Sequence, residues 1–522
     1  MVGSGAPTLR CQLFFLLTLF AVVPARAQTV KLDPSSMPKS GTVDARYLSF
    51  NIEMVEVTGG RFWKPYSSAP SAAPTRSGPG AGMYEYRPPI DLASPRLRKL
   101  AAALGPSYMR VSGTWANSTW FQDNDRPAAA HPPTGFNSVL TRAEWKGVLD
   151  FSRAVDAPLV TSVAVSAGTR NAQGVWTPVQ AKAVFDYTKS LGGHIAATAF
   201  MNEPTFAAMG GAPAGYTAAD FGRDAKLFAA FLRSESPDTQ YLGPGSVGEG
   251  VSLVPAGIPV HMLASKDLLE ASGPIFDVFS YHFYGAVSRR CGGHLTVDQA
   301  LSAEWLDRTV TGEAFYAGLR DQYLPGKPLW LTETGEAACG GDPLAAQFVD
   351  TFRFLNQLGV LAQRGVQVVM RNTLNASDYG LLDEQTLAPR PDYWAALLWK
   401  RLMGPVVLNP GLPDPGPASE LALRLYAQCL PEKKGGVALL ALNTDRHSTR
   451  TLSLPHAAER YTLTAPDLTS STVLLNGMAL RAHADGSLPA LHAEHVRAGT
   501  LTLAPLSVTF LRIPAAQNAA CR

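Results

Sequence analysis

The sequence lacks several features that would identify a partner or a cofactor. Its 45 Lys and Arg residues nearly balance 42 Asp and Glu residues, for a formal net charge of +3. So small an excess does not indicate a nucleic-acid partner. No G-x-G-x-x-G or P-loop glycines, which would bind a dinucleotide or phosphates, follow the first predicted strand. No Cys-x-x-Cys pair or Cys/His ligand spacing occurs, which argues against a metal site. We therefore expect no cofactor, no metal and no nucleic acid.

No apolar run near the N-terminus is long enough to span a membrane. Residues 13–23 are apolar except for Thr18, follow Arg10, and precede a small-x-small cleavage pattern at residues 24–27. A membrane-spanning helix needs about 20 apolar residues, so this run is too short for one. Its form is typical of a secretory signal peptide. We predict a signal peptide at residues 1–27, a secreted mature chain and no membrane attachment after cleavage; an uncleaved anchor is the alternative.

Cysteine is also rare. Of the five cysteines, Cys11 lies in the predicted signal, which leaves Cys291, Cys339, Cys429 and Cys521. Four cysteines allow three pairings, and pairing is expected in an oxidising compartment. We favour 291–339, joining two loops near Glu333, and 429–521, tying the last residues to the C-terminal region. Four free buried thiols are the alternative.

What the chain does contain is an alternation of strand-like and helical patterns. Amphipathic stretches at 95–104, 143–154, 179–191, 221–234 and 344–363 separate apolar runs that read as strands. Eight such runs occur, at 47–54, 107–112, 159–165, 195–201, 240–243, 276–282, 329–332 and 366–371. This alternation predicts a (β/α)8 TIM barrel over residues 46–404. A doubly wound open sheet would alternate in the same way, but the missing glycine motifs count against it.

The character of the sequence changes after the barrel. Residues 409–417 are rich in Pro and Gly and resemble a linker. Short strand-like runs follow at 421–428, 436–442, 449–454, 458–464 and 500–513. They predict an antiparallel β-sandwich at residues 405–522. The N-terminal segment, residues 28–45, is a candidate for a further strand of that sandwich, at 29–33.

Two glutamates stand where a parallel barrel presents its catalytic groups. Residues 195–204 read IAATAFMNEP and residues 329–336 read LWLTETGE, two apolar runs that lead to Glu203 and Glu333. Catalytic groups of such barrels lie at the carboxyl ends of the strands. Glycoside hydrolysis uses two carboxyl groups, one that donates a proton and one that attacks or supports the anomeric carbon. We assign Glu203 as proton donor and Glu333 as nucleophile; a structural cap or a solvated residue is the alternative for either alone.

Two long irregular segments interrupt the barrel, at residues 59–89 and 114–137. Loops of this length are usually functional or disordered, and both are expected at the active face. The second contains Trp115, Trp120 and Phe121. These aromatic rings are candidates for stacking on sugars, and ordinary packing is an equal alternative.

Several stretches of the barrel sequence resemble the retaining (β/α)8 glycosidases, and more narrowly the heparanase-type β-glucuronidase family. The resemblance extends along the whole barrel and rests on YLSFNIE (47–53), SPRLRKLAAALGPSYMRVSGT (94–114), FMNEP, YHFYG (281–285), LTETGEAACGG (331–341), VVMRN (368–372) and DYGLLDEQTLAPRPDYWAALLWKRLMG (378–404). The C-terminal cysteines also resemble that family's disulfide. The resemblance implies a retaining β-glucuronidase acting on a glucuronic-acid-containing oligo- or polysaccharide.

The resemblance also implies roles for single residues. Glu203 would be the acid/base and Glu333 the nucleophile. Without the resemblance, ordinary barrel packing would be the preferred interpretation of Tyr284, His282 and Tyr379. The implied substrate-binding set is Asn202 at the sugar 2-hydroxyl, Tyr284 orienting the nucleophile, His282 lining the pocket, Tyr379 and the Gly340 amide at the substrate carboxylate, Arg110 keeping the nucleophile ionised, and Glu53 and Thr114 lining the sugar site.

The chain departs from the family pattern in ways that bear on its substrate. Ala338 and Cys339 stand where a tyrosine and a first glycine are expected, so the carboxylate pocket differs. The lysine-rich segments by which mammalian heparanase grips sulfated chains have no counterpart here. A long excisable linker between the second strand and the next helix is also missing, which favours a single chain, and we expect a monomer. Arg289 and Arg290 form a basic pair near the site, with a solvated rim as the alternative.

The two long loops and the missing lysine clusters favour removal of single terminal sugars. Endo-acting cleavage of glycosaminoglycan, a neutral-sugar glycosidase and a non-catalytic carbohydrate-binding protein are the alternatives.

Overall fold

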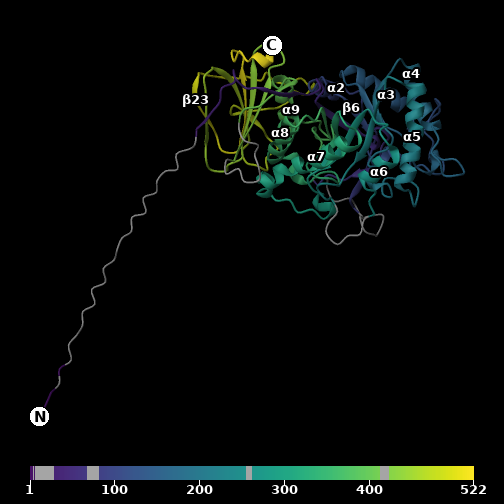
Figure 1. Cartoon of the computed structure of the whole chain (residues 1–522), viewed down its shortest axis with the longest axis horizontal. Coiled ribbons are helices and arrows are strands. Elements are labelled where there is room, and N and C mark those ends of the chain that lie inside the picture. The colour runs from purple at the N-terminus through teal and green to yellow at the C-terminus, as the bar shows by residue number, and fades with distance from the viewer. Residues whose placement is uncertain (4, 6–28, 67–81, 254–260, 412–421) are drawn as a thin grey trace.

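The computed structural model describes residues 1–3, 5, 29–66, 82–253, 261–411 and 422–522. The predicted signal peptide lies outside these residues from residue 6 onward, and so does the predicted linker from residue 412. A closed barrel and an antiparallel β-structure lie side by side in the described part (Figure 1). Within it, no helix combines the length and apolar character needed to cross a bilayer.

Eight parallel strands close the barrel, which confirms the predicted fold. Each strand pairs only with neighbours along the chain, and the last returns to the first. The strands are largely buried on both faces, which explains their nearly continuous apolar sequences. In chain order they are β3 (Leu48–Glu53), β6 (Met109–Ser112), β9 (Leu159–Ser162), β10 (Ile195–Ala199), β11 (Gln240–Ser246), β12 (Val278–Tyr284), β13 (Leu329–Gly335) and β14 (Val368–Arg371).

Helices surround the barrel, and their starts follow from local capping. The Thr141 hydroxyl accepts a hydrogen bond from the Glu144 amide, and Thr217 caps its helix in the same way through Asp220. Such capping satisfies amides that have no partner within the helix. The helices are α1 (Met54–Thr58), α2 (Pro95–Ala102), α3 (Arg142–Ala154), α4 (Val179–Ser190), α5 (Ala218–Glu235), α6 (Ser265–Ser272), α7 (Ala303–Tyr323), α8 (Phe348–Gln363) and α9 (Pro391–Leu402).

Two sheets form the predicted β-sandwich beside the barrel. The larger has the order β2-β15-β16-β17-β24-β19-β20-β21, with β22 added to β19, and the smaller has the order β1-β18-β23. An apolar cluster with members from both sheets fills the space between them. The strands are β1 (Thr29–Lys31), β2 (Lys39–Thr42), β15 (Val406–Leu408), β16 (Leu423–Cys429), β17 (Val437–Asn443), β18 (Arg450–Leu454), β19 (Ala458–Thr464), β20 (Leu474–Leu475), β21 (Met478–Ala479), β22 (Glu494–Val496), β23 (Gly499–Leu503) and β24 (Ser507–Ile513).

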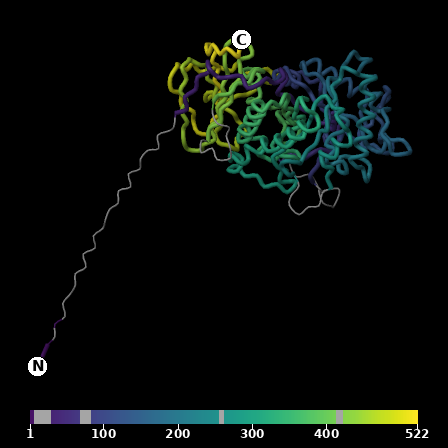
Figure 2. Tube along the Cα trace, viewed as in Figure 1, coloured from purple at the N-terminus to yellow at the C-terminus, as the bar shows by residue number. Residues whose placement is uncertain are grey.

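Residues 29–42 and the C-terminal strands meet in these sheets. The N-terminal segment supplies β1, parallel to β18, and β2, antiparallel to β15. Figure 2 shows this purple segment running along the yellow C-terminal strands. The Cys429–Cys521 disulfide joins the end of β16 to the last residues, as predicted.

One predicted strand was wrong. Residues 500–513 form two strands, β23 and β24, which belong to different sheets. Pro505 has no N–H to continue a ladder, and Leu506 adopts a positive φ of 48°. These two residues turn the chain from one sheet to the other.

The large sheet packs directly against the barrel's helices, with α8 and α9 on the side of the barrel that faces it (Figure 1). The Tyr426 hydroxyl donates to Asn356 Oδ1 at 2.6 Å. Gly359 of α8 lies against the Tyr426 ring, where a Cβ would overlap the ring. The close approach of helix and sheet therefore requires glycine at this position.

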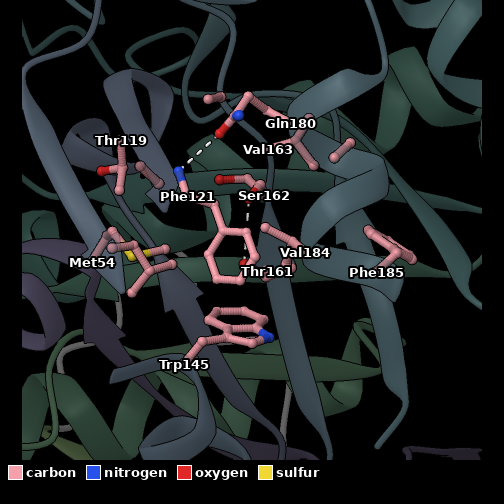
Figure 3. Close-up of a pocket in the computed structure, with 14 residues that line it drawn as sticks. Met54, Thr119, Phe121, Trp145, Thr161, Ser162, Val163, Gln180, Val184 and Phe185 are labelled. Carbon is pink, nitrogen blue, oxygen red and sulfur yellow. Dashed lines mark hydrogen bonds between the residues drawn. The ribbon is translucent and has the colours of Figure 1, made fainter. Parts of the chain in front are cut away.

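The second long loop folds against the outside of the barrel. It forms η1 (Thr114–Ser118) and β7 (Thr119–Gln122), which pairs with β8 (Ser138–Thr141). The Phe121 amide donates to Gln180 of α4 at 2.8 Å. The Phe121 ring is buried beside a cavity of about 40 Å³ that Trp145 and Val184 also line (Figure 3). Packing, and not sugar stacking, accounts for Phe121.

Replacing Phe121 by Ala tests this placement. Removing a buried aromatic ring is expected to lower the free energy of unfolding by about 3–5 kcal/mol, as measured by urea denaturation. The kinetic constants per folded molecule are expected to stay unchanged, because Phe121 packs against α3 and α4. A changed KM in the folded variant would instead place this loop at the substrate.

Candidate active site

Glu203 follows β10 and is held in an uncommon backbone conformation. Its φ of 50° and ψ of 63° are left-handed, a region that non-glycine residues occupy at a cost and often at functional sites. The preceding residue is fixed from outside the strand. Asn117 accepts from the Asn202 amide at 2.8 Å and donates to the Asn202 carbonyl at 2.9 Å. The second loop thereby positions the turn that carries Glu203.

Glu333 lies on β13, and two hydrogen bonds fix its carboxylate. Arg110, on β6, donates to Glu333 Oε2 at 2.8 Å. The Tyr284 hydroxyl, at the end of β12, donates to Oε1 at 2.8 Å. Arg110 also donates to Asn202 Oδ1 at 2.7 Å. One guanidinium therefore links the strand that carries Glu333 to the turn that carries Glu203.

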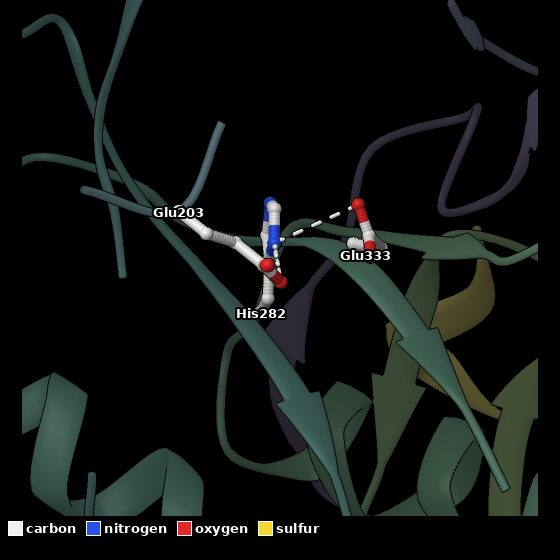
Figure 4. Close-up of side chains that lie close together, drawn as sticks. All are labelled: Glu203, His282 and Glu333. Carbon is white, nitrogen blue, oxygen red and sulfur yellow. Dashed lines mark hydrogen bonds and ion pairs between the residues drawn. The ribbon is translucent and has the colours of Figure 1, made fainter. Parts of the chain in front are cut away.

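His282 lies between the two glutamates (Figure 4). Its Nδ1 is 3.0 Å from Glu203 Oε1 and 3.7 Å from Glu333 Oε2. One ligand-type atom from each of the three residues lies within 4.8 Å of the others. Atoms so spaced have the geometry to hold a metal ion, but the Arg110 guanidinium already occupies Glu333 Oε2 with a positive charge.

The spacing of the two carboxylates carries stereochemical information. Retaining glycosidases place their carboxyl groups about 5–5.5 Å apart, whereas inverting ones leave about 6.5–9.5 Å for a water molecule. Oxygens of Glu203 and Glu333 within 4.8 Å of each other correspond to the retaining arrangement.

The surroundings of the two carboxyl groups separate their pKa values. Burial raises the pKa of Glu203, and the negative charge of Glu333 raises it further. Burial opposes ionisation of Glu333 too, but the attraction of His282 and Arg110 and the hydrogen bond from Tyr284 outweigh it and lower its pKa. Divergent pKa values of this kind assign acid and base roles to a carboxyl pair. Glu203 is suited to carry the proton and Glu333 to stay ionised.

Glu53 completes the polar floor of the site. The Asn372 amide donates to Glu53 Oε1 at 3.0 Å and to the Tyr284 hydroxyl at 3.1 Å. Burial raises the pKa of Glu53 well above its ordinary value, and Glu333 adds to the effect. Gly113, at a φ of 92°, leaves room for Glu53, because a Cβ there would overlap its carboxylate. Glu53 is therefore suited to be a neutral hydrogen-bonding group.

A glycine-containing loop after β13 forms a second part of the site. Cys339, Gly340 and Gly341 all have positive φ, at 63°, 81° and 81°, and a disulfide joins Cys339 to Cys291 as predicted. No acceptor for their three backbone amides is found among the described residues. Tyr379 packs against Gly341. The structure thus brings the predicted residues Gly340 and Tyr379 together at a group of unpaired N–H donors.

Arg290 is not part of a solvated rim. Its side chain is 7% exposed and pairs with Asp378 at 2.8 Å. Arg289 is half exposed and pairs with Asp342. The alternative reading of this basic pair is therefore wrong for Arg290, because its guanidinium contacts three other segments of the chain, at Lys64, Cys339 and Asp378.

Aromatic side chains from both long loops border the site. Trp63 of β4 (Gly60–Trp63) stacks on Tyr84 of β5 (Tyr84–Arg87) with ring centroids 4.5 Å apart. Trp115 meets both rings edge-on, at 6.4 Å from each. Trp115 is therefore the part of the second loop that reaches the rim, unlike Phe121.

Some of the site was not anticipated, and one predicted residue stands apart. Asn117, Asn372 and Arg290 had no assigned role beforehand, although Asn372 directly follows an apolar strand, as Glu203 and Glu333 do. Thr114 makes no hydrogen bond to the other predicted site residues in the described part of the chain. The remaining predicted residues lie together.

The coupling between Arg110 and the carboxylates can be tested by pH dependence. Arg110 lowers the pKa of Glu333 and, less strongly, that of Glu203. Arg110→Gln is expected to move the acid limb of the kcat/KM profile for an aryl glycoside to higher pH, because Glu333 then ionises later, and to shift the basic limb upward by less. Arg170→Gln, at another buried arginine, is the control. An acid limb that stays in place would contradict the assignment of Glu333.

Known proteins similar to this chain include a heparanase and a glucuronidase. A mouse heparanase is 29% identical over 489 residues, which cover 82% of this chain and 88% of that protein. A baicalin-beta-D-glucuronidase from Scutellaria baicalensis is 33% identical over 255 residues, 46% of each chain. No protein-family model matches the sequence.

A solved structure supports the fold. The 4-O-alpha-L-rhamnosyl-beta-D-glucuronidase from Fusarium oxysporum superposes with a TM-score of 0.64 at 13% identity, covering 93% of this chain and all of that one. So low an identity supports the architecture alone. Over most of its length, this chain is therefore similar to heparanase and heparanase-like proteins.

Proposed function

We propose that the protein is a retaining β-glucuronidase that hydrolyses β-glucuronosyl linkages by double displacement. The observation that carries this proposal is the pair Glu203 and Glu333, whose oxygens lie within 4.8 Å of each other and whose pKa values are displaced in opposite directions. The enzymes named heparanase and baicalin-beta-D-glucuronidase among its relatives support glucuronide as the substrate class.

The reaction follows from the two protonation states. Glu333 attacks the anomeric carbon as a carboxylate while protonated Glu203 gives its proton to the departing glycosidic oxygen. The aglycone leaves as an alcohol, and the sugar is held as an ester of Glu333. Glu203, now ionised, takes a proton from water, and the resulting attack on the anomeric carbon breaks the ester. Two inversions return the original configuration and both carboxyl groups to their starting states.

The neighbouring polar groups have complementary tasks. Asn202 accepts from Arg110 through Oδ1, which leaves its amide NH₂ as a donor for the sugar 2-hydroxyl. Tyr284 keeps Glu333 pointed at the anomeric carbon through its 2.8 Å hydrogen bond. His282 contacts Glu203 at 3.0 Å and holds its carboxyl group towards the scissile bond.

The loop of residues 339–341 supplies the recognition of a uronic acid. Consecutive backbone N–H groups in left-handed conformations form concave sites that bind anions. The amides of Cys339, Gly340 and Gly341, which have no acceptor in the part of the chain that the structure describes, would donate to the substrate carboxylate, with Tyr379 beside them. Replacement of the expected tyrosine and glycine by Ala338 and Cys339 therefore leaves the amides in place and ties them by a disulfide.

The protein is proposed to act as a secreted single chain. Both disulfides suit an oxidising compartment, and the apolar run at residues 13–23 has the form of a signal peptide.

The mode of cleavage depends on how the site is closed. Removal of single terminal sugars is favoured by the β4–β5 hairpin, whose Trp63 and Tyr84 wall the site. Internal cleavage is favoured by the second loop, because its strands β7 and β8 pack against α3 and α4, while Trp115 meets Trp63 and Tyr84. We rank exo action first and endo action second.

Variants at the two glutamates test the mechanism. The wild type is expected to prefer an aryl glucuronide to the matching glucoside and xyloside and to release β-glucuronic acid first, as seen by NMR. Glu333→Gln should abolish turnover while the fold remains. Glu203→Ala should slow poor leaving groups far more than activated ones, because only poor ones need the proton. An inverted first product, or equal losses on both kinds of leaving group, would contradict these assignments.

Product analysis decides between the two modes of cleavage. Exo action is expected to release only glucuronic acid from a glucuronide-capped oligosaccharide and to leave the size of an internal-glucuronide polymer almost unchanged. Size-exclusion chromatography of the polymer provides the measurement. A rapid fall in polymer size with release of oligosaccharides would establish the endo mode and overturn our ranking.

A further inference from the structure

Arg290 contacts three other segments that border the active site. Its guanidinium donates to the carbonyl oxygens of Cys339 at 2.7 Å and Lys64 at 2.8 Å, and to Asp378 Oδ2 at 2.8 Å. The same group lies 4.0 Å from the centroid of the Tyr66 ring. These partners belong to the segments after β4, β13 and β14, and Arg290 itself follows β12.

The contacts converge on the residue that begins the anion-binding loop. Three residues that follow β12 hold Cys339: Arg290 and Ser288 donate to its carbonyl oxygen, at 2.7 Å and 3.2 Å, and Cys291 is bonded to its sulfur. The adjoining backbone is paired as well, because the Ala338 amide donates to Ala286 at 2.9 Å. Two consecutive residues, Arg290 and Cys291, therefore fix one left-handed residue from two directions.

Residues that follow β14 also donate hydrogen bonds to a carbonyl group of this loop. The Ser377 hydroxyl donates to the Gly340 carbonyl at 3.0 Å, and the Asp378 amide donates to it at 3.2 Å. With the Cys339 and Gly340 carbonyl oxygens occupied, the peptide planes cannot rotate without losing these bonds. The amides of residues 339–341 are thereby turned away from the supporting loops.

The charge of Arg290 is not available to the substrate. Its guanidinium is matched by Asp378 and stacked on Tyr66, and its side chain is 7% exposed. Gly340 lies between Arg290 and Trp63, where any Cβ would collide with both. Arg290 therefore lies behind the loop, as a support, and does not reach the position of a bound sugar.

We propose that Arg290 is a positioning residue that gives the site its selectivity for a uronic acid, by holding the Cys339–Gly341 amides in the conformation that receives a carboxylate. This inference rests on the proposed glucuronidase function. It assigns selectivity to a buried cation that never touches the substrate, and it places that control in the loop after β12.

Arg290→Gln tests the proposal with paired aryl glucuronide and aryl glucoside substrates. The variant is expected to raise KM for the glucuronide about tenfold, which corresponds to about 1.4 kcal/mol, with kcat changed less than about twofold, because binding is lost equally in ground and transition states. The constants for the glucoside, which lacks the carboxylate, should change little. Arg290→Lys should behave like Arg290→Gln, because an ammonium cannot reproduce the planar set of donors.

Arg170→Gln is the matched control. Arg170 is also buried, pairs with an aspartate, Asp224, at 2.7 Å, lies over a tyrosine ring, that of Tyr216, and donates to backbone carbonyls, but it does not touch residues 339–341. Its loss should lower stability without changing the glucuronide-to-glucoside ratio of kcat/KM. Deuterium uptake of a peptide covering residues 337–343 should rise in Arg290→Gln and not in Arg170→Gln.

The results distinguish a failure of the role proposed for Arg290 from a failure of the proposed glucuronidase function. A wild type without preference for the glucuronide would overturn the proposed function and the selectivity role together. A wild type that prefers the glucuronide, with a ratio unaffected by Arg290→Gln or lowered equally by Arg170→Gln, would overturn the role of Arg290 alone.

Discussion

The active site depends on how one buried arginine distributes its hydrogen bonds. Arg110 donates to Glu333 at 2.8 Å and to Asn202 at 2.7 Å. It lies on β6, which pairs with β3 and β9, so it reaches across the barrel to both residues. A buried carboxylate without a cation would take up a proton, because burial disfavours its charged form. Arg110 therefore makes the ionised Glu333 compatible with the barrel's interior and fixes Asn202 beside it.

The two glutamates differ in protonation because Glu333 receives more hydrogen bonds than Glu203 does. Glu333 receives hydrogen bonds from Arg110 and Tyr284, whereas the carboxyl group of Glu203 hydrogen-bonds only to His282 among the described residues. Each charge also acts on the other group, since Glu333 raises the pKa of Glu203. The nucleophile thus helps to keep the acid protonated, so one charged group establishes both roles.

The sequence predicted the parts of the molecule that repeat a simple rule, and it failed where contacts are long-range. Apolar strands ending in polar residues located the barrel, Glu203 and Glu333, because parallel strands carry their functional groups at one end. Residues 500–513 were misread as one strand, because apolar patterning continues through the turn at Pro505. Asn117 and Arg290 look like ordinary loop residues; their partners, Asn202 and Cys339, are far away in sequence, and no local pattern reveals such pairs.

This difference reflects how the fold divides its tasks. Strand ends place the catalytic groups through the closed hydrogen-bonded barrel, which any suitable apolar sequence can build. The loops that shape the substrate pocket have no such ladder, so each must be fixed by specific polar contacts, as Asn117 fixes the turn before Glu203. Arg290 and the Cys291–Cys339 bridge do the same for the loop after Glu333. Differences in substrate among related barrels are therefore expected to arise in these supporting contacts, which change the pocket while leaving the two glutamates in place.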